Sequence, residues 1–406
     1  MPAVLETVRV LDLSRILAGP WAGQLLADLG AEVIKVERPG RGDDTRGWGP
    51  PYLNDADGHP AESAYYLSTN RGKHSVAIDL TRPEGQALVR ALAAQSDILL
   101  ENYKVGGLRR YGLDYASLRG VNPRLIYCSI TGFGQTGPYR ERAGYDFLLQ
   151  AMGGLMSITG APDADGGEPT KVGVALTDIL TGLYATVASL GALAHRERTG
   201  EGQHIDLALL DVQVATLANQ AMNYLVGGQV PGRMGNAHPN IVPYQTFPTR
   251  DGYLVLTVGN DEQFRRLCEI MARPDLPDDH RYATNAARVA NREVLIPELS
   301  AVFRTRATGA WLADLEAAGV PCGPVNSIDR VFADPQIQAR GMQTVTEHPQ
   351  LGAVPAVANP IRYSATPLDS TRPAPRLGEQ TDTILRDILG HSDEAIAELR
   401  RQRVIG

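Results

Sequence analysis

The sequence has only three cysteines, and they lie far apart, at Cys128, Cys268 and Cys322. An odd number of widely spaced cysteines fits neither a disulfide framework nor a zinc site, and it is typical of a chain from a reducing compartment. The eight histidines show no HExxH or other paired spacing. We therefore expect no bound metal and a cytoplasmic protein.

A targeting segment is also lacking. The opening, MPAVLETVRVLDLS, has no basic region followed by an apolar core of signal length, so we expect no secretory leader. Residues 174–194 are long enough to suggest a membrane span, but they include Asp178, Ser189, three threonines and two glycines. A central aspartate costs about 2.5–3.5 kcal/mol on insertion scales. We predict a buried helix of a soluble protein and no membrane partner.

Charge of one sign is nowhere concentrated. The chain has 39 Lys+Arg and 46 Asp+Glu, a net charge of −7. Residues 1–150 hold 17 of each, and the remainder holds 22 against 29, which accounts for the whole imbalance. No basic run is dense enough to indicate a nucleic-acid partner. An anionic ligand would be received best by the first 150 residues.

What the chain has in abundance is alternation of strand and helix patterns. An apolar strand over 8–14, a helix over 18–30 and a strand over 31–37 form a β-α-β unit. Three more strands follow at 74–80, 97–102 and 124–134, with a helix at 83–95. This order predicts an α/β fold with a parallel, doubly wound sheet, whose ligands bind beyond the carboxyl ends of the strands. The segments expected there are 14–20, 37–49, 101–107 and 131–146.

The character of the chain changes after residue 222. Residues 224–247 are rich in Gly, Pro and Asn and are typical of a linker. The patterns at 250–271 and 308–319 predict a smaller α/β domain, and 373–390 is again helical. We predict a large domain over 1–222, a small domain with linkers over 223–329, and a segment over 330–406 that returns to the large domain.

The first β-α-β unit invites comparison with a dinucleotide-binding domain. Glu37 stands where such a domain places its ribose-binding acid, but the GxGxxG fingerprint is missing and the loop reads SRILAGPWAG. Arg38, Arg41 and Arg46 follow, and arginines there suit a phosphate. They also fit a solvated basic loop, and the sequence leaves both interpretations open.

Asp178 is the one carboxylate in the segment KVGVALTDILTGLYA, residues 171–185. It precedes an apolar run, so it could cap a helix. It could also carry chemistry, because a helix N-terminus lowers a carboxylate's pKa and keeps it ionised, as a carboxylate nucleophile requires. The two interpretations are compatible, and composition alone does not choose between them.

Seven segments, in order along nearly the whole chain, resemble the class III CoA-transferases of the CaiB/BaiF type. They are VLDLSRILAGPWAGQLLADLGAEVIKVERPGRGDDTR, STNRGKHSVAIDL, ENY, GFGQTGPYRERAGYD, GGLMSITG, KVGVALTDILTGLYA and LGEQTDTIL. Within the family, the closer likeness is to the group that moves CoA between succinate and glutarate. The segments GDDTRGWGPPY, AGYD, GNAHPNIVPYQTF and VGNDEQF carry it.

The resemblance implies a fold and a mechanism. The fold would be a Rossmann-like doubly wound large domain plus a smaller α/β domain, in an interlocked homodimer. Asp178 would be the catalytic nucleophile, attacking an acyl-CoA thioester to form an aspartyl anhydride and then an aspartyl-CoA thioester. Coenzyme A would be a substrate, with no permanently bound cofactor. The donor would be succinyl-CoA, and the acceptor glutarate or a similar dicarboxylate.

The resemblance also implies CoA contacts. They fall on Leu17, Ala18, Arg38, Ile78, Asn102, Tyr103, Arg110 and Tyr145, with Arg71 and Lys73 as further basic candidates. Formyl-CoA:oxalate enzymes carry Gln where Leu17 stands and a run of glycines where this chain has GNDEQ. We therefore do not expect oxalate or formate as substrates.

A dicarboxylate keeps one free carboxylate while the other is activated, and a closed site must offer that charge a cation. The candidates are Arg46, Arg71 and Arg233, with Trp48 and His238 as possible walls. Each arginine could instead be a surface group or contact CoA phosphate. Gly259 and Asn260 resemble the segment that closes over the family's site.

Three alternatives stay open. Racemases of the same superfamily use a GHD motif where this chain has Gly144, Tyr145 and Asp146, and tyrosine, with a pKa of about 10, is a poor base at neutral pH. An NAD-dependent dehydrogenase would need the missing glycine fingerprint. A CoA-binding protein without activity would leave the surroundings of Asp178 unused.

Overall fold

The computed structural model describes residues 3–55, 57–368 and 372–406, and the chain divides into two compact units. The large unit comprises Met1–Leu155, Val172–Ala221 and Pro335–Gly406. The small unit comprises Met156–Lys171 and Met222–Asp334. Residues 156–171, expected in the large domain, thus belong with the small unit. They are held there because the carbonyls of Gly160 and Ala161 accept hydrogen bonds from the Gly235 N–H and the Arg233 side chain.

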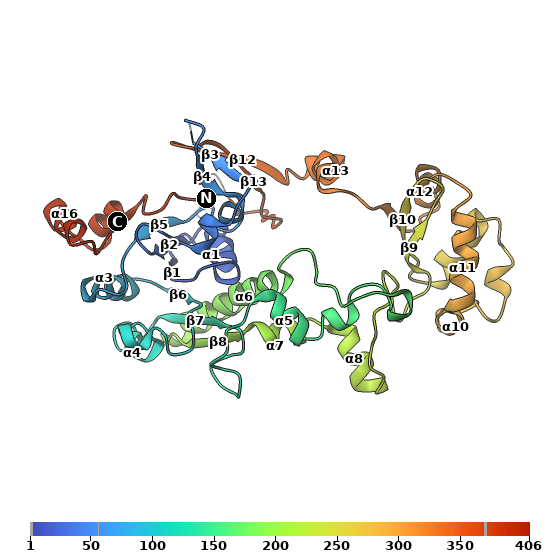
Figure 1. Ribbon diagram of the computed structural model, residues 1–406, viewed down its shortest axis with the longest axis horizontal. Helices are drawn as coiled ribbons and strands as arrows, with labels where there is room; N and C mark the ends of the chain where they lie inside the picture. Colours follow the sequence, from blue (N-terminus) through green and yellow to red (C-terminus); the bar gives the residue numbers. More distant parts are fainter. Residues whose placement is uncertain (1–2, 56, 369–371) are drawn as a thin grey trace. The chain divides into compact units, whose positions relative to one another are not determined.

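A six-stranded sheet in the order β5-β2-β1-β6-β7-β8 lies at the centre of the large unit (Figure 1). All its pairings are parallel, as predicted. Its strands are β1 Arg9–Asp12, β2 Glu32–Glu37, β5 His74–Ala77, β6 Ile98–Glu101, β7 Ile126–Thr131 and β8 His204–Ala208. Strand β8 was not predicted. The strand order reverses between β1 and β6, and this is where ligands bind in such sheets.

Both faces of this sheet are buried. Val10 and Leu11 are neighbours on β1 and point to opposite faces, yet both are fully buried, in two separate apolar clusters. One cluster includes residues of helices α1 (Ala18–Asp28) and α6 (Leu176–Thr199). The other includes residues of α3 (Pro83–Ala94), α15 (Thr381–Asp387) and α16 (Asp393–Arg401). The continuous apolar runs of the strands follow from this double burial.

The large unit also holds most of the helices. They are α1 Ala18–Asp28, α2 Ala64–Leu67, α3 Pro83–Ala94, α4 Tyr115–Arg119, α5 Asp146–Met152, α6 Leu176–Thr199, α7 Leu209–Ala215, α14 Pro335–Ala339, α15 Thr381–Asp387 and α16 Asp393–Arg401. Two antiparallel hairpins complete it, β3 Tyr52–Asn54 with β4 Pro60–Ser63, and β12 Gln343–His348 with β13 Gly352–Val357. The hairpins were not predicted.

Helix α6 is long and apolar enough to cross a membrane by length and composition, a test that core helices also pass. It packs closely on α1, since a Cβ at Gly182 would lie 2.7 Å from the carbonyl oxygen of Ala18. Its other face is open, and Val187 is 66% exposed. The predicted helix is therefore present, but it is buried on one face only.

The C-terminal segment of the chain packs on the large unit. The side chain of Gln380 accepts a hydrogen bond from the Ser75 N–H, and that of Thr381 accepts one from the Ala77 N–H. These contacts place α15 beside β5, at the edge of the parallel sheet. Ile405 forms a bridge to Ile78, just beyond the same strand.

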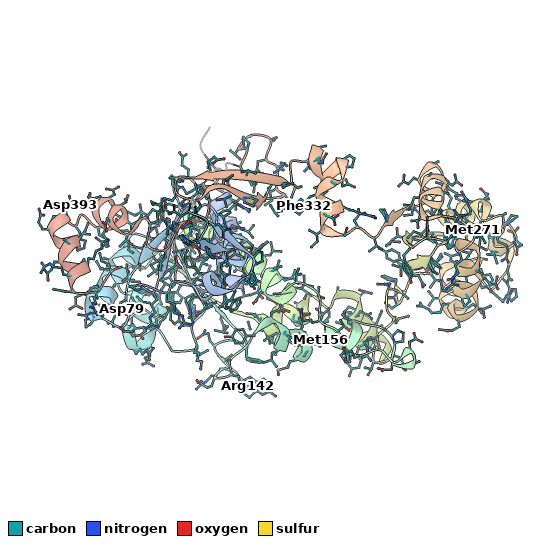
Figure 2. All side chains as sticks on the ribbon, turned by 45° about the horizontal axis from the view of Figure 1, so that its top comes forward. Asp79, Arg142, Met156, Met271, Phe332 and Asp393 are labelled. Carbon is teal, nitrogen blue, oxygen red and sulfur yellow. The ribbon has the colours of Figure 1, made fainter. Side chains whose placement is uncertain are left out.

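The small unit has its own core. Its antiparallel sheet, in the order β11-β10-β9, packs with helices around buried residues such as Phe247, Phe264 and Trp311. Met271 belongs to the same cluster (Figure 2). The elements are α8 Ala218–Gly227, which begins in the large unit, β9 Tyr244–Pro248, β10 Tyr253–Thr257, α9 Asp261–Ile270, α10 Asn285–Ala290, α11 Arg292–Phe303, α12 Thr308–Ala317, β11 Cys322–Pro324 and α13 Ile328–Ala333.

Candidate active site

Asp178 lies in the first turn of α6, but it does not cap the helix. The N-cap residue is Ala175, whose side chain makes no cap hydrogen bond. Asp146, at the start of α5, does the capping: its Oδ2 accepts hydrogen bonds from the N–H groups of Thr177 at 2.8 Å and Asp178 at 3.2 Å. Within the described residues, the Asp178 carboxylate has no hydrogen-bond donor of its own. It is left available for chemistry.

The surroundings of Asp178 raise its pKa to about 7. Burial is the main cause, because it disfavours the charged form, and the like charge of Asp146 adds to it. Our expectation that the helix N-terminus keeps this pKa low is therefore wrong. A carboxylate with such a pKa is a stronger base than an ordinary aspartate, and close to half of it is ionised at neutral pH.

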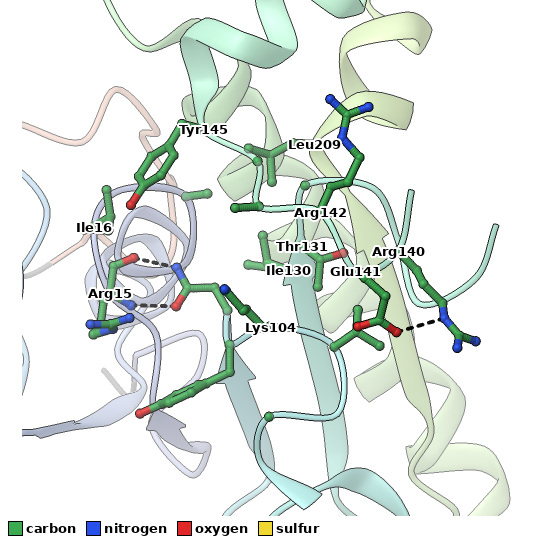
Figure 3. Close-up of a pocket in the computed structure, with 18 of the residues that line it drawn as sticks. Arg15, Ile16, Lys104, Ile130, Thr131, Arg140, Glu141, Arg142, Tyr145 and Leu209 are labelled. Atoms are coloured by element: carbon green, nitrogen blue, oxygen red, sulfur yellow. Dashed lines mark hydrogen bonds and ion pairs between the residues drawn. The ribbon is translucent and has the colours of Figure 1, made fainter. Parts of the chain in front are cut away.

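Asp178 opens into a cavity of about 540 Å³, here called the large cavity (Figure 3). The loops that follow β1, β6 and β7 line it, so it lies at the carboxyl ends of the strands, as predicted. The structure brings seven of the predicted site residues together there: Leu17, Ala18, Asn102, Tyr103, Arg110, Tyr145 and Asp178.

Two of these loops are tied to one another where the strand order reverses. The Asn102 side chain accepts a hydrogen bond from the Arg15 N–H at 2.9 Å and donates one to the Arg15 carbonyl at 2.6 Å. The next residue, Ile16, has a φ of 74°, which is strained for a β-branched residue. Its N–H donates to the buried Asp43 carboxylate at 3.2 Å. The loop after β1 is thus held in one conformation.

Arg38 and Ile78 line a second cavity of about 290 Å³, here called the small cavity. Arg15 and Tyr103 line both cavities. The residues implied in CoA binding are therefore divided between two adjoining hollows with a common wall.

The large cavity is strongly cationic. Five basic side chains line it against two carboxylates, Glu141 and Asp178. The basic residues are Arg15, Lys104, Arg110, Arg140 and Arg142. Arg15 and Arg140 are paired with Asp44 and Glu141. Across residues 3–55, 57–368 and 372–406, the other three have no carboxylate partner within ion-pair distance.

Four of these cations were not singled out from the sequence, namely Arg15, Lys104, Arg140 and Arg142. The signal was present, because each stands in a loop expected at the carboxyl ends of the strands. What was lacking is any pattern that says which basic side chains of such a loop turn inward. Figure 3 labels Arg15, Lys104 and Arg142 among the side chains that line the cavity and draws the Arg142 guanidinium pointing away from Lys104. The Arg142 guanidinium lies against the Phe133 and Tyr139 rings.

Arg46 and Glu37 are engaged with one another. The Arg46 guanidinium donates to both oxygens of Glu37, at 2.8 and 2.7 Å, and also pairs with Glu62. Ion pairing outweighs burial and lowers the pKa of Glu37. Glu37 is therefore not free to bind a ribose, and Arg46 lines neither of the two cavities.

Arg71 and Lys73 are likewise buried in ion pairs. Arg71 binds both oxygens of Asp28, at 2.9 and 2.6 Å. Lys73 donates to Asp12 at 2.9 Å, and burial lowers its pKa to about 8. Neither lines the large or the small cavity. Trp48 is half-exposed and packs edge-on against Tyr65.

The remaining candidates belong to the small unit. Arg233 is paired with Asp163, and the His238 ring packs at 5.2 Å from that of Tyr244. Asn260 is the N-cap of α9, where its side chain accepts a hydrogen bond from the Gln263 N–H. The Gly259 N–H donates to the Gln263 side chain. A substrate role for these residues stays a prediction.

Comparison with known proteins gives one consistent answer. A family model described as CoA-transferase family III matches residues 5–381. Succinate–glutarate CoA-transferase of Agrobacterium fabrum is 56% identical over 389 residues, covering 95% of each chain. Succinyl-CoA:glutarate CoA-transferase of Homo sapiens is 47% identical over 401 residues, covering 99% of this chain and 90% of the human protein.

Solved structures agree with these relatives. The crystal structure of a CaiB/BaiF family protein from Brucella suis superposes with a TM-score of 0.84 at 51% sequence identity, covering 96% of this chain and all of that one. With an unpaired carboxylate in a cationic hollow and relatives of this closeness over nearly its full length, the chain is a class III CoA-transferase and belongs to CoA-transferase family III.

Proposed function

We propose that this enzyme moves CoA from succinyl-CoA to glutarate or a similar dicarboxylate, with Asp178 as the nucleophile. The observation that carries the proposal is the free carboxylate of Asp178 in the lining of a cationic cavity. The names of two relatives at 56% and 47% identity support the substrate pair.

In the first half-reaction, an ionised oxygen of Asp178 attacks the thioester carbonyl of succinyl-CoA. The C–S bond breaks, CoA leaves as a thiolate, and a succinyl–aspartyl anhydride remains. The thiolate then attacks the aspartyl carbonyl, which releases succinate and leaves Asp178 as a CoA thioester. An anhydride preserves the activation of the thioester without ATP, and this is why the nucleophile is a carboxylate.

The second half-reaction runs the same steps in reverse order. A carboxylate of glutarate attacks the aspartyl-CoA thioester, and CoA leaves again as a thiolate. The thiolate attacks the glutaryl carbonyl of the new anhydride, giving glutaryl-CoA and restoring the Asp178 carboxylate. These steps need no resident cofactor.

We infer that the cation that binds the distal carboxylate of the acid lies in the large cavity. Arg46, Arg71 and Arg233 are each occupied by a carboxylate of the chain. Lys104 and Arg142 line the same cavity as Asp178 and lack such a partner among the described residues, while Arg110, which also lacks one, is implied in CoA binding. An unpaired cation is the natural counterpart of an incoming carboxylate.

Transfer is favoured over racemisation by the cavity lining. A racemase needs a second base to move the α-proton of its substrate. The described residues that line the large cavity include no histidine, and Glu141, the only carboxylate besides Asp178, is paired with Arg140. Tyr145 stands where those racemases carry the histidine of their motif.

A homodimer is supported by apolar side chains that the single chain leaves exposed. They lie on α5, α6 and α7: Phe147, Leu148, Met152, Leu183, Tyr184, Val187 and Val214. Such a surface is typical of an interface. Val187→Asp should shift the mass measured by light scattering from dimer to monomer. If the dimer is interlocked, tagged and untagged copies should not exchange without unfolding. A cytoplasmic location stays a prediction.

The function is tested directly by supplying succinyl-CoA together with a panel of mono- and dicarboxylic acids and measuring new CoA esters by mass spectrometry. Glutaryl-CoA is the expected product. With succinyl-CoA alone, a digest should contain the peptide around Asp178 carrying a CoA adduct, and Asp178→Asn should lack it. Absence of any new CoA ester from the wild-type enzyme would refute the substrate pair, and an adduct on another residue would refute the nucleophile.

A further inference from the structure

The large and the small cavity meet at a wall made by two side chains. Only Arg15 and Tyr103 line both cavities in the described part of the chain, and the Arg15 guanidinium carbon lies 5.8 Å from the centre of the Tyr103 ring. Asp178 lies in the large cavity, and Arg38 lies in the small one. A single extended ligand that reaches both must pass Arg15.

The backbone and the side chain of Arg15 behave differently. The backbone is fixed by two hydrogen bonds to Asn102, which Figure 3 shows as dashed lines. The side chain is half-exposed, and its one ion pair in the described residues is with Asp44, at 2.9 Å. The guanidinium can therefore turn while the loop that carries it stays in place.

Asp44 is a partner that Arg15 can leave without cost to the carboxylate. Asp44 also pairs with Arg41, at 3.1 Å, and its side chain keeps 24% exposure. If Arg15 turns away, Asp44 retains both a cation and water. An ion pair this exposed contributes little to stability, whereas a guanidinium binds phosphate oxygens in a bidentate, charge-assisted arrangement.

The CoA contacts that the resemblance implies fall in both cavities, and we propose that Arg15, on the wall between them, exchanges Asp44 for the diphosphate of CoA. This inference rests on the proposed function, because it takes the ligand from it. The thioester end of CoA reaches Asp178 in the large cavity, and the adenosine end lies in the small one. The diphosphate, which connects the two ends, passes the shared wall. Asp44 then acts as a competitor that holds the guanidinium until the phosphates arrive.

If Arg15 exchanges Asp44 for the diphosphate, substitutions of these two residues should change the affinity for CoA in opposite directions. Arg15→Ala should weaken binding of CoA by about tenfold, since a charge-assisted contact is lost. Asp44→Asn should tighten binding severalfold, because it removes the competitor of the phosphates. A purely structural ion pair would instead make both variants weaker. Titration calorimetry with CoA on the full chain measures all of this, and Arg109→Ala, an exposed arginine outside both cavities, serves as the control.

Truncated ligands locate the contact along CoA. The loss in Arg15→Ala should be the same for succinyl-CoA and for its 3′-dephospho form, and it should vanish for succinyl-pantetheine, which has no diphosphate. A loss that vanishes with the 3′-dephospho form would place Arg15 on the 3′-phosphate and overturn the proposal. A loss of affinity that persists with succinyl-pantetheine would also overturn the proposal, because this ligand has no diphosphate. If the melting temperature shows that Arg15→Ala folds poorly, the same measurements can be made with Arg15→Gln.

The failure of this inference can be told from the failure of the proposed function. If wild type binds CoA and Arg15→Ala binds it equally well, the exchange is wrong, whatever acids the enzyme uses. If wild type binds CoA with the predicted pattern of variants but forms no glutaryl-CoA, the exchange holds and the substrate pair fails. If wild type binds no CoA at all, both fail.

Discussion

Asp146 and Asp178 share a helix terminus, where Asp146 caps α6 with its Oδ2 and leaves the Asp178 carboxylate free in the cavity. The cap stabilises the helix that carries the proposed nucleophile. Burial raises the pKa of Asp178 to about 7, and the negative charge of Asp146 adds to this effect. One residue thus positions the Asp178 carboxylate and contributes to its basicity.

This relationship predicts an acid limb in the pH profile of wild-type enzyme. Asp178 must be ionised to attack, so kcat/KM should be constant above about pH 8 and fall as the pH drops through 7, approaching tenfold per unit below it. The profile of kcat/KM for succinyl-CoA measures the limb in the free enzyme. A profile that stays flat down to pH 5 would contradict the raised pKa of Asp178.

Asp146→Asn should move that limb to lower pH. The asparagine oxygen can still accept from the N–H groups that Asp146 caps, but the like charge is gone, so the pKa of Asp178 should fall. The informative quantity is the ratio of kcat/KM at pH 6 to that at pH 8, because a uniform loss of folded enzyme leaves it unchanged. The ratio should be larger in Asp146→Asn than in wild type, and an equal ratio would show that Asp146 acts on structure alone.

Asp178→Asn should abolish transfer while stabilising the fold. An amide cannot form the anhydride, so a loss of at least several orders of magnitude is expected. Because the pKa of Asp178 is raised in the folded state, this group ionises first in the unfolded chain, and wild type loses stability progressively as the pH rises from about 4 to about 7. The melting temperature of Asp178→Asn should therefore exceed that of wild type by more at pH 8 than at pH 4. Turnover within tenfold of wild type would refute the nucleophile.

Arg38 and Arg110 should govern the KM for acyl-CoA and leave the KM for the acid nearly unchanged. Arg38 lines the small cavity and Arg110 the large one, and a charge-assisted contact to phosphate is worth about 1.5–3 kcal/mol. Changing either to Ala should raise the KM for succinyl-CoA about tenfold or more. Arg109→Ala is the matched control, since it neighbours Arg110 and lines neither cavity. Unchanged KM values in both variants would refute this mapping of CoA.

The helices and strands that could be predicted from the sequence are those whose residues form a recognisable local pattern. The alternation of the first strands and helices was recognised because each strand is a continuous apolar run, and the structure buries both Val10 and Leu11 for that reason. Strand β8 was missed because it lies at the sheet edge, where exposed His204 and Asp206 break the continuous apolar run that marks the other strands. The alternation of polar and apolar residues is itself a strand signal, but it extends over only five residues.

The candidate site was predicted as far as its residues lie in recognisable loops. The surroundings that tune it were not, since they join residues distant in the chain. Asp146 stands 32 residues before Asp178, so its effect on the pKa is invisible in the local sequence. The same holds for the basic residues, because the local sequence does not show that Arg71 forms an ion pair with Asp28, 43 residues away.

Arg71→Met should therefore act on stability. The Asp28 side chain is 1% exposed, and Arg71 supplies two of its hydrogen bonds. Removing the cation leaves a buried charge without its counter-ion, which costs about 3–5 kcal/mol. Denaturant unfolding should show this loss, while Arg401→Met, at an exposed pair on α16, should cost no more than about 1 kcal/mol. A raised KM for the acid at unchanged stability would instead restore Arg71 as a substrate contact.

The acid substrate is tested most sharply by removing one carboxylate from it. In the proposed complex, the distal carboxylate of glutarate meets a cation of the large cavity, where Lys104 and Arg142 have no carboxylate partner among the described residues and are not assigned to CoA. A monocarboxylate such as valerate fills the same length but leaves that cation desolvated and unpaired, and sites built to bind a polar group reject analogues that lack it. We expect kcat/KM for valerate to lie at least a hundredfold below that for glutarate.

Two variants, Lys104→Met and Arg142→Met, identify the cation. The variant that removes the residue binding the distal carboxylate should lower kcat/KM for glutarate but not for valerate, so the ratio of the two values should decrease. Equal kcat/KM values of wild type for valerate and glutarate would show that no cation binds the second carboxylate. The proposed dicarboxylate specificity would then be wrong, even if Asp178 is the nucleophile.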